Sequence, residues 1–273
     1  MTRGEGGRLA DGAFMDLWPE GAPGALGAAP EDRPALRVFL PEEPSAHGAS
    51  MIVCPGGGYQ MLAEHESAPV GKWLAKHGIT AFVLRYRLAP KYHYPCQFDD
   101  VRRAVRYVRA NAEKWKLNPD LIGMLGFSAG GHLTSIAATY FDAGDSASKD
   151  PIERVSSRLT VQVLIYSLIA LGTREHMRAE ENLLGPKPSP EMIERFSTQK
   201  HISAQTPPAF LVHSNRDTRV PPEHSDWYVQ ALRDAGIPYE YMLDDFGEHG
   251  CGLIDAWTVP CLRWLKCWLI DNG

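Results

Sequence analysis

Residues Leu121–Ala138 read LIGMLGFSAGGHLTSIAA, an apolar run that passes through a glycine-rich turn into helix-forming residues. The first five residues predict a buried strand, and a helix is expected from about Gly130 to Tyr140. Between them lies Gly126-Phe-Ser128-Ala-Gly130, a G-x-S-x-G motif. Such a strand–turn–helix exposes its serine at the edge of a sheet, and glycines are needed where neighbouring chains come too close for a Cβ atom. This setting favours a nucleophilic Ser128 over an incidental serine in a tight turn.

The alternation of apolar strand and amphipathic helix continues on both sides of this stretch. Strands are expected at 36–40, 50–54, 79–84, 161–166, 209–213 and 239–243, and helices at 64–77, 98–115, 223–235 and 253–270. Strands that are apolar on both faces and separated by helices are typical of a parallel sheet covered on both sides. The sequence therefore predicts an α/β fold with a mostly parallel central sheet and helices on both faces.

Two segments fall outside this alternation. Residues 1–34 are rich in Gly, Ala and Pro and show neither a helical nor a strand period, so we expect an extended arm packed on the domain. Residues 172–206 are polar and contain three closely spaced prolines, which indicates a small inserted cap. The expected organisation is one catalytic domain over 35–273, with the cap at about 172–206.

Composition and charge exclude several classes of function. The chain has 33 acidic against 28 basic residues, a net charge of -5, which argues against a nucleic-acid partner and predicts no anion-binding surface. The arginine-rich run Arg102–Arg109 is interpreted as a solvated helix face. No run of 18 apolar residues is present, so no membrane partner is expected. Five scattered cysteines and no signal-peptide pattern favour a cytoplasmic protein with reduced thiols.

A nucleophilic serine needs a general base and an acid that orients this base. In hydrolases built around a G-x-S-x-G turn, the acid follows a later strand and the histidine follows the last one. Asp217 lies in the loop after strand 209–213, and His249 lies in the loop after strand 239–243. We therefore predict a catalytic triad of Ser128, Asp217 and His249.

Other titratable residues near these loops compete for the same roles. His213 and His224 flank the Asp217 loop, but neither follows the final strand, and His224 is expected to open a surface helix. Asp245 and Glu248 are too near His249 in sequence to orient its ring from the far side, so they are interpreted as surface charges.

A second glycine-rich turn follows an early strand. Cys54–Tyr59 reads CPGGGY, and the amides of Gly57 and Gly58, together with that of Ala129, are candidate oxyanion-hole donors. A flexible turn is the alternative. A phosphate cradle is disfavoured because the expected lysine is absent and the spacing is not G-x-G-x-x-G.

Further candidates concern metals, substrate contacts and ion pairs. His65-Glu66 begins like the zinc motif H-E-x-x-H, but Pro69 occupies the place of the second histidine, so no metal is expected. Tyr59 and Trp227 are candidates for a sugar-binding rim, with packing as the equal alternative. Arg87 and Asp100 are expected to form a structural ion pair.

Taken together, the motifs resemble the α/β-hydrolase superfamily, and most closely its acetyl esterase branch of acetyl xylan and bifunctional feruloyl/acetyl xylan esterases. The motifs that carry this resemblance span about 17 to 252: Leu17-Trp18-Pro19, Pro55-Gly-Gly-Gly-Tyr59, His65-Glu66 before Trp73-Leu74, Tyr86-Arg87-Leu88-Ala89-Pro90, Gly126-Phe-Ser-Ala-Gly-Gly-His132, Thr206-Pro-Pro and Val220-Pro221. Pro55 stands where hormone-sensitive-lipase-like esterases have a histidine before three glycines, which favours the acetyl esterase branch. The resemblance implies the same triad and the same oxyanion donors.

The expected function is hydrolysis of short-chain, above all acetyl, esters without a cofactor. The substrate is expected to be a small molecule or an oligosaccharide ester, because the short, polar segment 172–206 offers no broad apolar surface for a lipid chain. A formamidase or amidase, or a peptidase on the same fold, remains the enzymatic alternative. A non-catalytic, ligand-binding relative is the alternative from another class. The sequence does not indicate an oligomeric state.

Overall fold

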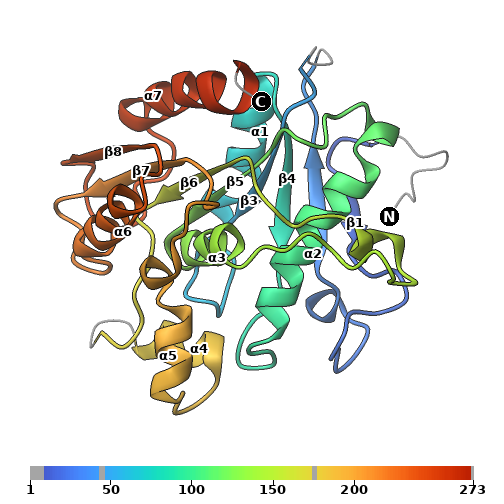
Figure 1. Ribbon diagram of the computed structural model, residues 1–273, viewed down its shortest axis with the longest axis horizontal. Coiled ribbons are helices and arrows are strands. Elements are labelled where there is room, and N and C mark those ends of the chain that lie inside the picture. Colours follow the sequence, from blue (N-terminus) through green and yellow to red (C-terminus); the bar gives the residue numbers. More distant parts are fainter. Residues whose placement is uncertain (1–8, 43–46, 174–176, 272–273) are drawn as a thin grey trace.

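The central element of the computed structural model is one eight-stranded sheet; the structure describes residues 9–42, 47–173 and 177–271 (Figure 1). The strand order is β1-β2-β4-β3-β5-β6-β7-β8; β2 runs antiparallel to both of its neighbours, and the remaining pairs are parallel. The strands are β1 Phe14–Asp16, β2 Ala35–Phe39, β3 Ser50–Cys54, β4 Thr80–Arg85, β5 Ile122–Phe127, β6 Val161–Ile165, β7 Ala209–Ser214 and β8 Tyr239–Asp244. The predicted mostly parallel sheet is confirmed.

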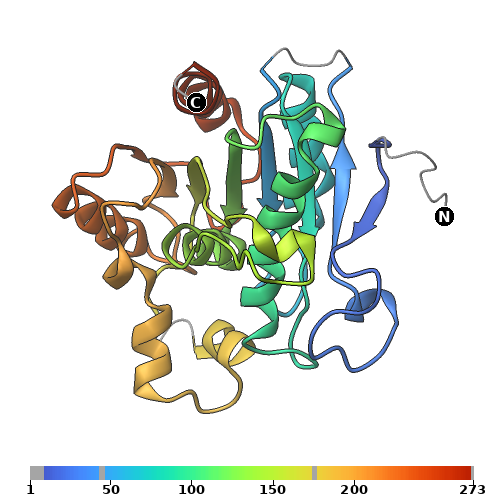
Figure 2. The ribbon, with the colours of Figure 1, turned by 45° about the vertical axis from the view of Figure 1, so that its right-hand side comes forward.

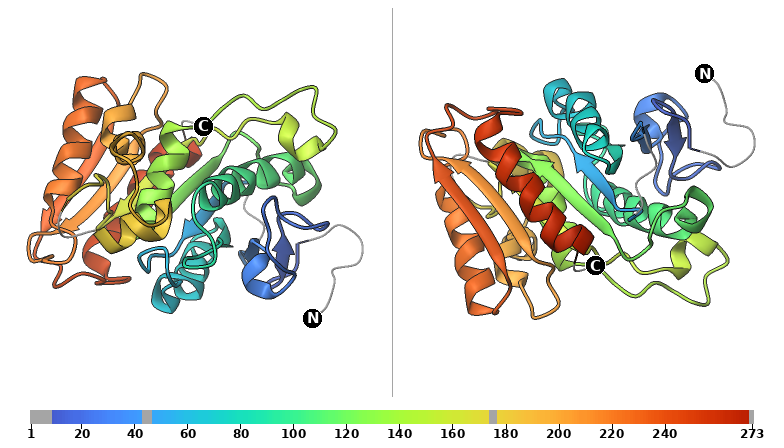
Figure 3. Two further views of the ribbon diagram at one scale, coloured as in Figure 1. Left: turned by 90° about the horizontal axis from the view of Figure 1, so that it is seen from below. Right: turned by 90° about the horizontal axis from the view of Figure 1, so that it is seen from above.

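Helices cover both faces of the sheet, as predicted. They are α1 Ala68–Lys76, α2 Cys96–Asn111, α3 Ser128–Thr139, α6 Glu223–Asp234 and α7 Asp255–Leu265, which continues as a π-helix over Lys266–Asp271. In β3, Ile52 and Cys54 pack on the side of α2 and α3, whereas Met51 and Val53 pack on the side of α1 and α7. Figure 3 shows these two layers, and α6 lies in the layer of α3. The continuous apolar runs in the sequence therefore reflect strands buried on both faces.

The N-terminal segment contributes a strand that the sequence did not predict. Within the predicted arm, β1 pairs antiparallel with β2, and Leu17 just after it is fully buried in the core. Three residues are too few to show a strand period. Exposed Phe14 on this edge strand packs under the guanidinium groups of Arg37 and Arg85.

The predicted cap segment lies between β6 and β7 and contains helices α4 Met177–Leu184 and α5 Pro190–Phe196, followed by a 3-10 helix, Thr198–His201. Figure 2 shows α4 and α5, in yellow and orange, beyond the carboxyl ends of the parallel strands. Ser189 caps α5 through the amide of Met192. Buried Phe196 anchors the segment because its ring lies 4.9 Å from that of Tyr94.

The structure corrects the prediction that the arginines of α2 form a solvated helix face. Arg103 and Arg106 are buried, and both bind the carboxylate of Glu153, at 2.7 and 2.9 Å. Sequence periodicity shows that a helix has a charged face, but it does not show that a later loop covers this face. The expected pair of Arg87 with Asp100 is confirmed at 2.7 Å, and both side chains are fully buried.

No helix within the described part of the chain combines the length and the apolar character that crossing a bilayer requires.

Candidate active site

Ser128 lies at the junction of β5 and α3, where the backbone makes a sharp turn. Its φ angle is +52°, a left-handed conformation that is strained for a residue with a side chain. A Cβ atom at Gly126 would overlap the carbonyl oxygen of Gly130, and a Cβ atom at Gly130 would overlap that of Cys54. The G-x-S-x-G pattern is therefore a steric requirement of this turn.

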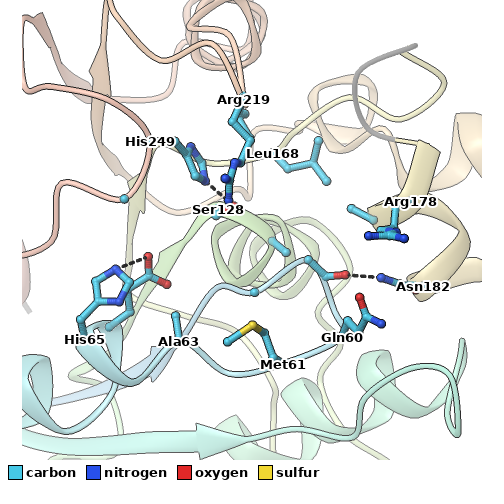
Figure 4. Close-up of a pocket in the computed structure, with 17 residues that line it drawn as sticks. Gln60, Met61, Ala63, His65, Ser128, Leu168, Arg178, Asn182, Arg219 and His249 are labelled. Carbon is cyan, nitrogen blue, oxygen red and sulfur yellow. Dashed lines mark hydrogen bonds and ion pairs between the residues drawn. The ribbon is translucent and has the colours of Figure 1, made fainter.

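His249, in the loop after β8, lies between Ser128 and Asp217, and Figure 4 shows its ring beside Ser128. Its Nε2 is 2.9 Å from the Oγ of Ser128, and its Nδ1 is 2.6 Å from Oδ2 of Asp217. The serine hydroxyl can donate to Nε2 while the Nδ1–H group donates to the carboxylate. The structure thus brings together all three residues of the predicted triad, in an order that allows a proton to pass from serine to imidazole.

Asp217 is buried, and burial by itself favours the protonated carboxyl group. Hydrogen bonds from His213 and His249 and from the amide of Val220 nevertheless hold the pKa of Asp217 well below its ordinary value. Oδ1 accepts from the amides of Arg219 and Val220 at 3.0 and 2.9 Å. Asp217 is therefore ionised at neutral pH and is fixed in orientation.

The two competing histidines, His213 and His224, are buried and form hydrogen bonds within the protein core. His213 is buried behind Asp217, with Nδ1 2.7 Å from Ser225 Oγ and Nε2 2.8 Å from the carbonyl oxygen of Val220. His224 is also buried, which corrects the expected surface position, and its Nδ1 accepts from the amides of Ile169 and Ala170. Neither residue lines the cavity that contains Ser128.

The glycine turn after β3 lies beside Ser128. Gly57 and Gly58 have φ angles of +124° and +61° and line the same cavity as Ala129. A Cβ atom at Gly57 would overlap the carbonyl oxygen of Met61, and Asn182 from α4 donates to the carbonyl oxygen of Gly58 at 2.8 Å. The structure places the three proposed oxyanion donors around one space, and their role there stays a prediction.

Glu66 is a site residue that the sequence did not reveal. Its buried carboxylate accepts from the amide of Gly56 at 2.6 Å and from the hydroxyl of Tyr166 at 2.9 Å. The ring of Tyr166 lies 4.9 Å from that of His249, edge to face. One carboxylate thereby joins the glycine turn to the surroundings of the candidate base. The sequence signal for Glu66 is the His65-Glu66 pair, which begins like a metal motif and also belongs to the motifs of the acetyl esterase branch, but neither observation assigns Glu66 a role.

No cluster of His, Cys, Asp and Glu among the described residues could hold a metal ion.

The cavity around Ser128 has a volume of about 640 Å³ and is lined from several loops and from α4. Met61, Leu168 and Val220 give it apolar surface, and Gln60, Arg178, Asn182 and Arg219 give it polar groups (Figure 4).

Neither residue proposed for a sugar-binding rim lines this cavity. Tyr59 is fully buried and its hydroxyl lies 2.8 Å from Nδ1 of His132, so it is a core residue. Trp227 is 42% exposed but lines a separate depression on α6. Adjacency in sequence to a site loop does not decide where a side chain points, and the structure corrects both assignments.

A protein-family model described as BD-FAE matches residues 36–232. Among solved structures, an acetyl ester-xyloside bifunctional hydrolase from Caldicellulosiruptor lactoaceticus superposes with a TM-score of 0.89 at 38% identity, covering 95% of this chain and 97% of its own. This similarity confirms the predicted fold.

Two sequence relatives carry names from xylan degradation. An acetylxylan esterase of Xylanibacter ruminicola is 35% identical over 233 residues, and endo-1,4-beta-xylanase B of Butyrivibrio fibrisolvens is 34% identical over 206 residues. The matches cover 83% and 73% of this chain, but only 45% and 32% of the relatives' own length.

Proposed function

The chain belongs to the BD-FAE family, and from that premise we propose that it is a serine carboxylesterase that removes acetyl groups from xylo-oligosaccharides or related sugars. The predicted resemblance to the acetyl esterase branch is confirmed by the family match and the relatives. The observation that carries the proposal is the hydrogen-bonded chain from Asp217 through His249 to Ser128, which opens into a cavity.

In the proposed first step, Ser128 Oγ bonds to the ester carbonyl carbon while its proton passes to Nε2 of His249. The carbonyl oxygen becomes an oxyanion, and the amides of Gly57, Gly58 and Ala129 donate to it. The bond to the sugar oxygen then breaks, and His249 returns the proton to this leaving group. Asp217, ionised and buried, stabilises the imidazolium that exists between these events.

In the second step, water replaces the sugar. His249 removes a proton from the water as its oxygen attacks the acetyl-serine carbonyl, and the proton then returns to Ser128 as acetate leaves. Acyl transfer through serine requires no redox or group-carrying cofactor, and none is proposed.

The cavity fits a small acyl group attached to a polar leaving group. Its apolar lining is restricted to a few side chains, whereas Gln60 and Asn182 can hydrogen-bond sugar hydroxyls. We propose that residues 35–273 act as one catalytic domain, with the segment of about 172–206 as its cap. The odd number and scattered placement of the five cysteines favour a reducing, cytoplasmic location.

The proposal is tested by comparing kcat/KM for esters of increasing acyl length, and for esters against a formamide. We expect kcat/KM to fall from p-nitrophenyl acetate to butyrate to octanoate, and we expect acetate release from acetylated xylo-oligosaccharides. N-formylkynurenine should react far more slowly. Rapid hydrolysis of the formamide without acetate release from any ester would replace the esterase proposal by a formamidase.

A further inference from the structure

Two arginines line the cavity around Ser128. Arg178 lies on α4 and Arg219 lies in the loop after β7, and both are exposed. Figure 4 shows Arg219 on the side of His249 and Arg178 on the side of Asn182. Neither guanidinium has an acidic partner among the residues that the structure describes.

Neighbouring arginines in the same two segments are bound within the protein. Arg216, three residues before Arg219, lies 3.5 Å from carboxylate oxygens of both Asp245 and Glu248. Arg195 on α5 lies over the rings of Tyr94 and Phe196. Arg178 and Arg219 therefore differ from these two nearby arginines, whose side chains are bound by other residues of the protein.

Two buried carboxylates beside Ser128, those of Glu66 and Asp217, already accept hydrogen bonds from other donors. Glu66 accepts from Gly56 and Tyr166, and Asp217 accepts from His249 and from the amides of Arg219 and Val220. Among the described residues, the rim presents two guanidinium groups that no carboxylate binds, although the chain as a whole is acidic. The net charge predicts no anion-binding surface, and these two arginines are the observation that argues against this prediction.

We propose that the cavity contains an anion-binding subsite beside the acyl-transfer site, and that its preferred substrates are acetyl esters of negatively charged sugars. The acetyl carbonyl lies at Ser128 while an anionic group elsewhere on the sugar pairs with Arg178 or with Arg219. Guanidinium groups pair with carboxylate and phosphate through two parallel hydrogen bonds. The anion is either the carboxylate of a uronic acid or a phosphate monoester. The inference rests on the proposed function and narrows its substrate class.

The test compares matched substrates that differ only in charge. One pair is acetylated xylo-oligosaccharides that carry a uronic acid and the same material with the carboxyl group reduced to an alcohol. The other pair is an acetylated glucose 1-phosphate and the corresponding acetylated methyl glucoside. We expect kcat/KM to be roughly three- to ten-fold higher for the charged member of at least one pair, and the ratio to approach one at about 0.5 M salt. The pair with the larger ratio identifies the source of the anion.

Variants assign the effect to the two arginines. Arg178→Gln with Arg219→Gln should bring the ratio of charged to neutral substrate close to one, whereas the control Arg216→Gln should keep the wild-type ratio. If the double variant does not fold, the wild-type ratio and its salt dependence decide the matter. Equal kcat/KM for charged and neutral substrates, with p-nitrophenyl acetate hydrolysed normally, would overturn the subsite alone. Failure to hydrolyse any acetate ester would instead overturn the proposed function.

Discussion

Two hydrogen-bonded networks of polar and charged residues, the arginine network and the catalytic network, differ in how they end. In the arginine network, Arg87 binds Asp100, and Arg103 and Arg106 bind Glu153. Every one of these groups has its partner inside the protein. In the catalytic network, Asp217 binds His249 and His249 binds Ser128, whose hydroxyl lies at a cavity.

This difference indicates that the arginine network stabilises the fold, whereas the catalytic network takes part in the reaction. A closed network satisfies the groups that folding has removed from water, so its loss lowers stability. A network that ends at a cavity leaves its last group available to a substrate, so its loss lowers the rate of reaction. Variants in the two networks should therefore affect different measurements.

The largest loss of activity is expected at Ser128, where the catalytic network reaches the cavity. Ser128→Ala removes the attacking oxygen, and kcat/KM for p-nitrophenyl acetate should fall at least about 10³-fold. The melting temperature should change little. Ser135→Ala is the matched control, because Ser135 lies on the same helix and its hydroxyl contacts Thr198 in the core. It should keep kcat/KM.

Breaking the arginine network should have the opposite signature. Arg87→Ala leaves the buried carboxylate of Asp100 without its partner, and the free energy of unfolding should fall by about 3–5 kcal/mol in urea denaturation. The folded fraction should keep its kcat/KM. Lys200→Ala, which removes an exposed ion pair with Glu194, should change stability little. Equal stabilities of the two variants would contradict the assigned role of Arg87.

Glu66 supports the catalytic network without contacting Ser128, so its effect should be smaller. Glu66→Gln keeps the shape of the side chain but removes its charge and replaces one acceptor by a donor, so both charge-assisted bonds to Gly56 and Tyr166 weaken, and the Tyr166 hydroxyl must turn to accept. We expect kcat to fall about tenfold, the equivalent of one buried hydrogen bond to a charged group, with KM little changed. Glu64→Gln, an exposed residue on the same turn, is the control. A change in KM alone would argue against positioning of the glycine turn.

The last prediction concerns stability at acid pH. His132 is fully buried between Tyr59 and the carbonyl oxygen of Phe196, and burial lowers its pKa to about 4. The unfolded chain binds this proton below about pH 6.5, whereas the folded protein binds it only below about pH 4. Stability should therefore decline as the pH falls from about 6.5 to about 4. His132→Gln should flatten this slope in urea denaturation, and exposed His77→Gln should not.

The fold followed from local patterns because apolar strands, glycine ends of helices and the G-x-S-x-G turn are each fixed by nearby atoms. Ser128, Asp217 and His249 could be predicted because each lies in a loop after a strand, and parallel strands bring such loops to one edge of the sheet. Strand β1 was missed because pairing with β2 alone holds its three residues.

The remaining errors concern side-chain direction across segments distant in sequence. Tyr59 follows the glycine turn yet points to His132, and Arg103 faces a loop that begins about 40 residues later. Glu66 acquires its role only because Gly56 and Tyr166 come from different strands. Such contacts leave no periodic signal in one sequence.

Covalent labelling of the nucleophile tests the central claim most directly. A fluorophosphonate reacts with a serine that a neighbouring base activates, and peptide mass spectrometry identifies the modified residue. We predict one adduct per chain, on Ser128, that forms in proportion to the loss of esterase activity and is absent from Ser128→Ala. Complete inactivation with the adduct on another residue, or full modification of Ser128 with activity retained, would contradict the account.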